Sequence, residues 1–161
     1  MPITLRAAGL DDAAFLFEVY ASTRAEELAL VPWSDEQRQE FLRMQFDAQH
    51  SYYHEQFPDA DYQVILADGE TVGRLYVARD IETIQILDIA VLPERRRAGV
   101  GSYLIQDLVA EAEKSERTVQ IYVETSNPSL GLFERFGFSK IAEEGLNVLL
   151  EWRASNSRLN N

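Results

Sequence analysis

Apolar and polar residues follow one another along this chain with a period that switches between that of a strand and that of a helix. Residues 3–7 alternate in the way expected of a short strand with one buried face. Two segments with helical spacing follow, the first capped by Asp11 or Asp12 and the second by Ser34 or Asp35. We therefore expect one strand and then two helices.

The middle of the chain predicts three strands. Two apolar runs joined by Asp68 and Gly69 indicate a hairpin with a glycine-containing connection. The next strand is predicted over residues 83–92, and its run 84–91 is apolar except at Gln85 and Asp88. Because polar positions are so few, this strand is predicted to lie centrally with both faces covered.

The remaining elements are expected, in order, as helix, strand, helix and two strands. They are placed after the loop 94–98 and at residues 119–123, 127–137, 138–142 and 147–152. Asn127 as N-cap with Pro128 at the first helical position sets the start of the second of these helices, and Gly137 sets its end.

Length and composition predict one folded domain over residues 1–153 with a frayed tail at 154–161. A chain of 161 residues buries roughly 70% of the surface that it exposes when unfolded, and 46% of these residues are hydrophobic. No apolar stretch approaches the roughly 18 residues of a membrane span, and the start lacks a charged segment followed by an apolar one. We expect a cytoplasmic protein with no membrane partner.

Charge and cysteine content narrow the functions further. The net charge of −12 disfavours binding to nucleic acid and mildly favours cationic partners. The chain has no cysteine, so disulfides, thiolate metal sites and a cysteine nucleophile are all excluded.

Residues 93–102, Pro-Glu-Arg-Arg-Arg-Ala-Gly-Val-Gly-Ser, join the central strand to an amphipathic helix. The first N–H groups of a helix have no acceptor within it, and the helix dipole places partial positive charge there. Three arginines beside such a terminus, in a chain of net charge −12, predict a pyrophosphate site. On spacing alone, an equal alternative is a solvated arginine turn whose glycines only satisfy the backbone. Neither a P-loop nor a dinucleotide fingerprint is present.

The segment from Val91 to Gly101 resembles the acetyl-CoA loop of the GNAT superfamily of N-acetyltransferases. Arg96, Gly99 and Gly101 fill the fixed positions of its pattern, (Arg or Gln)-x-x-Gly-x-(Gly or Ala). A second match, Asn127-Pro128 followed by Leu-Phe-Glu-Arg-Phe-Gly-Phe at residues 132–138, is similar to the family's last helix and its Gly-Phe ending. The order of elements also agrees over nearly the whole chain.

The resemblance implies the fold of that family: α/β (α+β), with a central mixed sheet of six to seven strands, about four helices and central strands that splay apart. It implies acetyl-CoA as co-substrate, with the pantetheine arm between the splayed strands and the pyrophosphate on the loop. The residues implied to hold it are Ile89, Ala90, Val91, Arg96, Arg97, Ala98, Gly99, Val100, Gly101, Ser102, Asn127 and Phe133.

The resemblance also implies acetyl transfer to a primary amine, and without cysteine the amine is expected to attack the thioester directly. Many family members have a tyrosine acid where this chain has Phe133, which donates no proton. Tyr103, Tyr122 or a water then takes that role, or the thiolate leaves unprotonated, which a thiol pKa of about 8.5 tolerates.

Asp88 and Glu124 are the candidate general bases, because Gln85 stands roughly where some family members have a glutamate. The acceptor amine, on a small molecule, peptide or protein, is expected to meet the helical segment before the hairpin. His50 and His54 share a helical face there but lack a clear third ligand, so no metal is expected.

Two rival functions stay open at this point. The first is a sensor that binds the coenzyme without turnover, which is compatible with Phe133 because this side chain donates no proton. The second is a nucleic-acid binder, against which the net charge of −12 argues. A homodimer is compatible with the sequence, which does not fix the oligomeric state.

Overall fold

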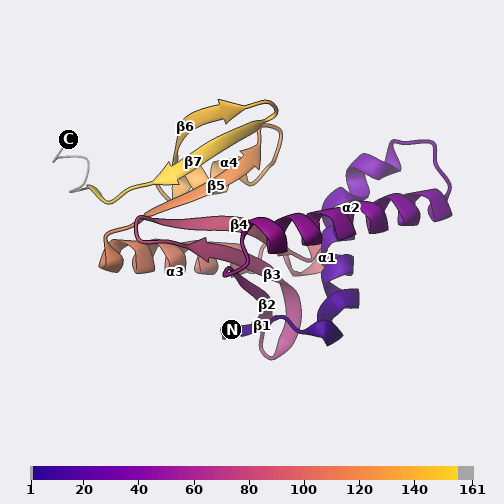
Figure 1. The fold of residues 1–161 in the computed structure, drawn as a ribbon, viewed down its shortest axis with the longest axis horizontal. Helices are drawn as coiled ribbons and strands as arrows, with labels where there is room; N and C mark the ends of the chain where they lie inside the picture. The colour runs from indigo at the N-terminus through magenta and orange to yellow at the C-terminus, as the bar shows by residue number, and fades with distance from the viewer. Residues whose placement is uncertain (1, 156–161) are drawn as a thin grey trace. The chain divides into compact units, whose positions relative to one another are not determined.

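The computed structural model describes residues 2–155. Seven strands and four α-helices lie within this range. In chain order they are β1 (Ile3–Ala7), α1 (Ala13–Ala29), α2 (Asp35–Gln56), β2 (Asp61–Ala67), β3 (Glu70–Arg79), β4 (Thr83–Val91), α3 (Val100–Ser115), β5 (Thr118–Glu124), α4 (Leu130–Arg135), β6 (Ser139–Glu144) and β7 (Asn147–Trp152) (Figure 1). The predicted order of strands and helices is confirmed. Most of the tail predicted from residue 154 lies outside the described residues.

Hydrogen-bonded neighbours among the strands follow the order β1-β2-β3-β4-β5-β7-β6. The pairs β1–β2, β5–β7 and β6–β7 are antiparallel, whereas β4 and β5 are parallel. The expected mixed sheet with about four helices is therefore confirmed.

Contacts within the chain divide it into two compact units that both include parts of β3 and β4. The first unit comprises Met1–Leu75 and Ile89–Arg96, and the second comprises Tyr76–Asp88 and Arg97–Asn161. The expectation of one domain over residues 1–153 stays a prediction.

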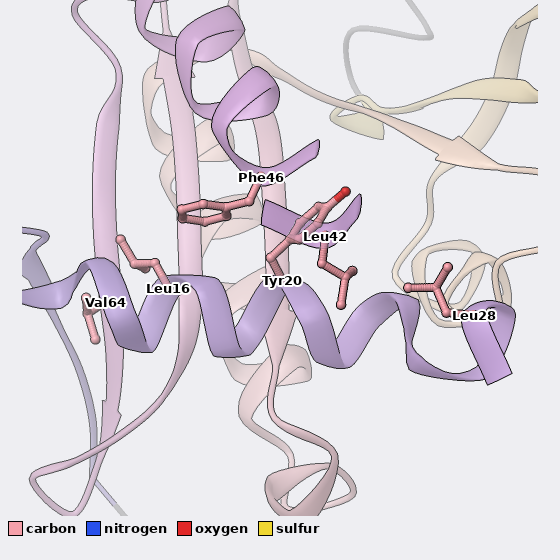
Figure 2. Packing of buried hydrophobic residues seen from close by; sticks show 6 residues of the cluster. All are labelled: Leu16, Tyr20, Leu28, Leu42, Phe46 and Val64. Carbon is pink, nitrogen blue, oxygen red and sulfur yellow. The ribbon is translucent and has the colours of Figure 1, made fainter. Parts of the chain in front are cut away.

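The core of the first unit is formed by α1, α2 and β2. Its buried members are Leu16, Tyr20, Leu28, Leu42, Phe46 and Val64 (Figure 2). Ser34 caps α2 as predicted: its hydroxyl accepts a hydrogen bond from the Gln37 N–H, and the Gln37 side chain accepts one from the Ser34 N–H. This capping box fixes where the second helix starts, and so which face of it meets α1.

The β2–β3 hairpin turns at Asp68 and Gly69. Both residues have positive φ, 53° and 82° respectively. A two-residue turn with two left-handed residues matches the twist of the flanking strands, which explains the Asp-Gly sequence. The predicted hairpin is confirmed.

The second unit packs α3 against the start of the parallel strand pair. The buried stripe of α3 consists of Val100, Leu104, Ile105, Leu108 and Ala112. In β4, Ile84 and Ile86 are buried, but residues 87–91 are only half-buried. The expectation that both faces of this strand are covered is therefore wrong for its second half. The reason is that β4 pairs with β5 only in its first half, from Thr83–Thr118 to Ile86–Ile121.

Candidate functional site

The end of β4 is an apolar strand segment that is not fully covered. Residues 87–91 are half-buried, although four of these five residues are apolar. In the first unit this end is held in place from β3, because the Leu92 N–H donates a hydrogen bond of 2.8 Å to the Val72 carbonyl. Uncovered apolar strand surface of this kind is suited to an extended ligand that lies along the strand.

Two of the three loop arginines are tied to the first unit. Arg95 forms an ion pair with Glu70 of β3. The Nε of Arg96 donates a hydrogen bond of 3.1 Å to the Val91 carbonyl. The Arg96 side chain is thus held beside the strand end, while an arginine still has four further N–H groups to offer.

The loop then enters α3 through two residues in the left-handed region. Arg97 has a φ of 68°, and Gly99, the residue before the helix, has a φ of 79°. A glycine is favoured at position 99 because that conformation strains a residue with a side chain. The first turn of α3 contains no acidic residue, so its N–H groups, including those of Val100, Gly101 and Ser102, can receive an anion.

Gly101 differs from Gly99 in that neither its φ nor a close contact within residues 2–155 requires a glycine. It lies inside α3, its φ is not in the left-handed region, and a Cβ added to it would meet nothing within 4 Å. A glycine in a helix costs stability relative to alanine, by roughly 0.5–1 kcal/mol. The open space over this position suits close approach of a ligand to the backbone.

Arg97 carries the remaining exposed charge of the loop. Within residues 2–155, its guanidinium forms none of the hydrogen bonds or ion pairs that occupy Arg95 and Arg96. An exposed guanidinium close in sequence to a helix N-terminus is suited to phosphate oxygens.

Asn127 precedes α4 but does not begin it. The predicted start at residues 127–128 is wrong by two residues, because α4 runs from Leu130 to Arg135. The Asn127 side-chain oxygen instead accepts a hydrogen bond of 2.9 Å from the Ser129 N–H, which closes a turn ahead of the helix. This side chain is exposed, and its predicted role at the pantetheine end stays a prediction.

Phe133 is a core residue of the second unit. Its side chain is 1% exposed and meets Phe138 edge-to-face, with 5.2 Å between ring centroids. Both rings thus belong to the packing of α4 and the chain after it. The predicted role of Phe133 in holding the coenzyme stays a prediction.

The candidate acids and bases of the second unit lie on β4, β5 and α3. Asp88 is half-buried and Glu124 is exposed at the end of β5. The phenols of Tyr103 and Tyr122 belong to residues that are 50% and 43% exposed. All four side chains are thus open enough to meet a substrate, and their roles stay predictions.

Sequence reasoning missed Arg74, which lies in the middle of β3 and is only 2% exposed. Its guanidinium donates a hydrogen bond of 2.9 Å to the Gln49 side chain on α2 and lies 5.7 Å from the centre of the Tyr20 ring on α1. The phenol of Tyr20 donates to Gln45 at 3.1 Å. Arg74 is the only charged residue in the run from Val72 to Val77 of β3, and this was the signal for the polar cluster that it forms with α1 and α2.

His50 and His54 lie on α2 with their ring centroids 4.2 Å apart, and His54 also stacks on Tyr62. Burial, and then the neighbouring His50, lower the pKa of His54. No group of three or more potential ligands that could hold a metal occurs among the described residues. The two histidines instead form a row of ring contacts that runs from Phe46 through His50 and His54 to Tyr62.

A hollow of about 640 Å³ in the second unit is separate from this loop. It is lined by residues of α4, β6 and β7 and the segments beside them, including Glu134, Lys140 and Val148. No residue predicted to hold a ligand lines it.

Comparison with known proteins shows which family this chain resembles. Residues 23–138 match the model of the Acetyltransferase (GNAT) family. A protein of Bacillus subtilis, provisionally assigned as a ribosomal protein bS18-alanine N-acetyltransferase, is 28% identical over 158 residues, 91% of this chain and 92% of the relative.

Two crystal structures share the fold. PaiA N-acetyltransferase from Thermoplasma acidophilum, in complex with coenzyme A, has a TM-score of 0.71 at 17% identity, with 96% of this chain and 100% of that chain covered. The ribosomal-protein-S18-alanine N-acetyltransferase from Escherichia coli has a TM-score of 0.62 at 18% identity, with 94% of each chain covered. Among the described residues, no helix is long and apolar enough to cross a membrane.

Proposed function

Because the chain belongs to the GNAT family of acetyltransferases, we propose that it transfers the acetyl group of acetyl-CoA to the primary amine of a small molecule, peptide or protein. The observation that carries the donor half is Gly101, a helical glycine that no contact or dihedral angle in the described part of the chain requires. It lies in the first turn of α3, directly after the arginine loop, where a pyrophosphate finds unsatisfied N–H groups.

In this proposal the loop binds the diphosphate and β4 binds the pantetheine arm. Backbone N–H groups of residues 97–102 receive the pyrophosphate, and the exposed guanidinium of Arg97 adds charge. Backbone groups of residues 89–91 hold the arm, which covers their half-buried apolar side chains. Asn127 approaches the pantetheine end, and Phe133 packs beneath it.

Direct attack in a ternary complex accounts for the chemistry, because the chain has no cysteine to carry the acetyl group. The amine nitrogen attacks the carbonyl carbon, the carbon–sulfur bond breaks, and sulfur leaves with the bonding electrons as a thiolate. Asp88 or Glu124 takes the proton that the amine loses. The products are an N-acetylated amine and coenzyme A.

Among acceptors, the N-terminal amine of a peptide or protein is favoured by the Bacillus subtilis relative, whose assigned substrate is the alanine of a ribosomal protein. At 28% identity this is a guide to the first substrates to test. The net charge of −12 adds a preference for acceptors rich in positive charge.

Release of free thiol from acetyl-CoA tests this proposal. The full chain is incubated with acetyl-CoA and a panel of acceptors: peptides with N-terminal alanine, the same peptides with a blocked N-terminus, polyamines, amino acids and aminoglycosides. We expect thiol release that depends on a free amine. Coenzyme binding without acceptor-dependent release would favour the rival function, a coenzyme sensor, and absence of coenzyme binding would contradict both functions.

A further inference from the structure

Gly73, a buried residue of β3, lies against the backbone of β4. A Cβ added to it would lie 2.2 Å from the Ala90 carbonyl oxygen, 3.0 Å from the Val91 Cα and 3.1 Å from the Ala90 carbonyl carbon. All three atoms belong to the backbone of β4, and all of these residues belong to the first unit. No side-chain rotation can relieve such contacts, so even alanine is excluded at position 73 unless β4 moves.

The direction of this contact shows how the Ala90 peptide is turned. In a strand, the Cβ projects from the face of the sheet, whereas carbonyl groups that pair with a neighbouring strand lie in its plane. An oxygen only 2.2 Å from the Cβ position of Gly73 is therefore turned out of that plane. Because a trans peptide is planar, its C=O and N–H point in opposite directions. The Val91 N–H is thus directed away from Gly73.

The chain is held in place shortly after the turned peptide. Two residues on, the Leu92 N–H donates to the Val72 carbonyl at 2.8 Å, which restores the pairing with β3. The ion pair between Arg95 and Glu70 holds the chain just beyond that point. The turned peptide is therefore followed by a stretch that is bonded to β3, and the missing side chain at position 73 provides the space for the peptide.

We propose that Gly73 is a positioning residue for the coenzyme: by admitting the Ala90 carbonyl over its Cα, it directs the Val91 N–H outward as the donor to an amide carbonyl of the pantetheine arm. This inference rests on the proposed function, in which residues 89–91 hold that arm. Gly73 itself does not touch the coenzyme. It acts through the path of β4.

Amide hydrogen exchange on the wild-type chain, with and without coenzyme A, tests the inference without any substitution. We expect the Val91 amide to become at least about tenfold more protected when coenzyme A is bound. Binding of coenzyme A without protection of this amide would overturn the inference and leave the proposed function standing. A wild-type chain that does not bind coenzyme A would overturn both.

The substitution Gly73→Ala provides a second test, with Gly9→Ala of the same unit as control, where the new Cβ meets only Asp12 at an ordinary 3.9 Å. In Gly73→Ala we expect the KM for acetyl-CoA to rise about tenfold or more, with kcat at saturating coenzyme changed less, since the reacting groups are untouched. Gly73→Ser should behave in the same way, because its Cβ would meet the same backbone atoms of β4. Circular dichroism establishes that each variant is folded. A folded Gly73→Ala chain with unchanged KM would overturn the inference, and if the variant does not fold, the exchange experiment decides alone.

Discussion

The Nε of Arg96 donates a hydrogen bond to the carbonyl oxygen of Val91, the last residue of β4. This bond holds the side chain of the second loop arginine at the end of the strand that precedes the loop. Arg95, the preceding residue, forms an ion pair with Glu70 of β3. Both side chains hold the loop start in one conformation, and a preformed loop spares the ligand the entropy of ordering it. Arg96 therefore has two tasks in this account, to fix the loop and to attract the diphosphate.

Arg96→Lys is predicted to weaken coenzyme A binding about tenfold although the charge is kept. A lysine ammonium cannot bond the Val91 carbonyl through a side-chain Nε and still present a planar fork of N–H groups to a phosphate. Arg97→Lys is the matched control and should lose much less, because the Arg97 side chain is exposed and its charge is what matters. Isothermal titration calorimetry measures both affinities. Equal losses in the two variants would contradict the role of the Arg96–Val91 hydrogen bond.

Gly101→Ala is predicted to move stability and binding in opposite directions. The new Cβ meets nothing within 4 Å, and alanine is the better helix former, so the free energy of unfolding should rise by up to about 0.5–1 kcal/mol. The same methyl group narrows the approach to the first turn of α3, so the affinity for coenzyme A should fall. Urea unfolding and calorimetry on one preparation measure the two effects. A chain that gains stability and keeps its affinity would place the coenzyme elsewhere.

Phe133→Tyr is predicted to cost about 1–2 kcal/mol of stability without raising kcat. The ring is 1% exposed and packed against Phe138, so a new hydroxyl enters a filled core. Thermal unfolding and acceptor-dependent thiol release measure the two quantities, with Phe136→Tyr, at a half-buried ring on the same segment, as control. A faster reaction in Phe133→Tyr would show that position 133 faces the departing thiolate and that a phenol there acts as an acid.

Asp12 is predicted to make the stability of the first unit sensitive to acid. Arg6 donates two hydrogen bonds of 2.8 Å to its carboxylate, and the Gly9 N–H donates a third at 2.7 Å. These bonds, above all those from Arg6, lower the pKa of Asp12 from 3.8 to about 2. The folded state thus favours the charged carboxylate, so this stabilisation is complete above the ordinary pKa and is lost as the pH falls through about 2.

Asp12→Asn should therefore lower the free energy of unfolding by about 1 kcal/mol at neutral pH, a modest figure because Arg6 is half-exposed and solvent screens the pair. The difference from the wild type should shrink towards zero near pH 2. Unfolding curves across this pH range check it. A constant difference at every pH would mean that the loss comes from packing rather than from the ion pair.

The sequence predicted those parts of the fold that local chemistry determines. Asp68 and Gly69 predicted the connection of the hairpin, and Ser34 or Asp35 predicted the start of the second helix, because each depends on residues that are neighbours in the chain. The structure adds the two left-handed residues of the turn and the capping box of Ser34. The arginine-glycine loop could also be predicted as an anion site, because the residues that would attract the anion are consecutive in the sequence.

Features that depend on residues distant in sequence escaped prediction. Nothing near Gly73 shows that the Ala90 carbonyl will lie over it, because that contact arises from the pairing of β3 with β4. The burial of Arg74 also depends on residues distant in sequence, because its contacts lie on α1 and α2. The partial burial of residues 87–91 depends on where the pairing of β4 with β5 ends. The start of α4 was misplaced because Asn127 closes a turn with Ser129, a local alternative to a helix cap that the same residues permit.

The central claim is that acetyl-CoA binds with its pyrophosphate on the first turn of α3. Titration of acetyl-CoA into the wild-type chain and into Gly101→Arg, followed by calorimetry, tests it most directly. The space over Gly101 is open, so the arginine leaves the fold and the thermal midpoint largely intact. We predict binding to one site in the wild type and no measurable binding in the variant. Unchanged affinity in a folded Gly101→Arg chain would contradict the account.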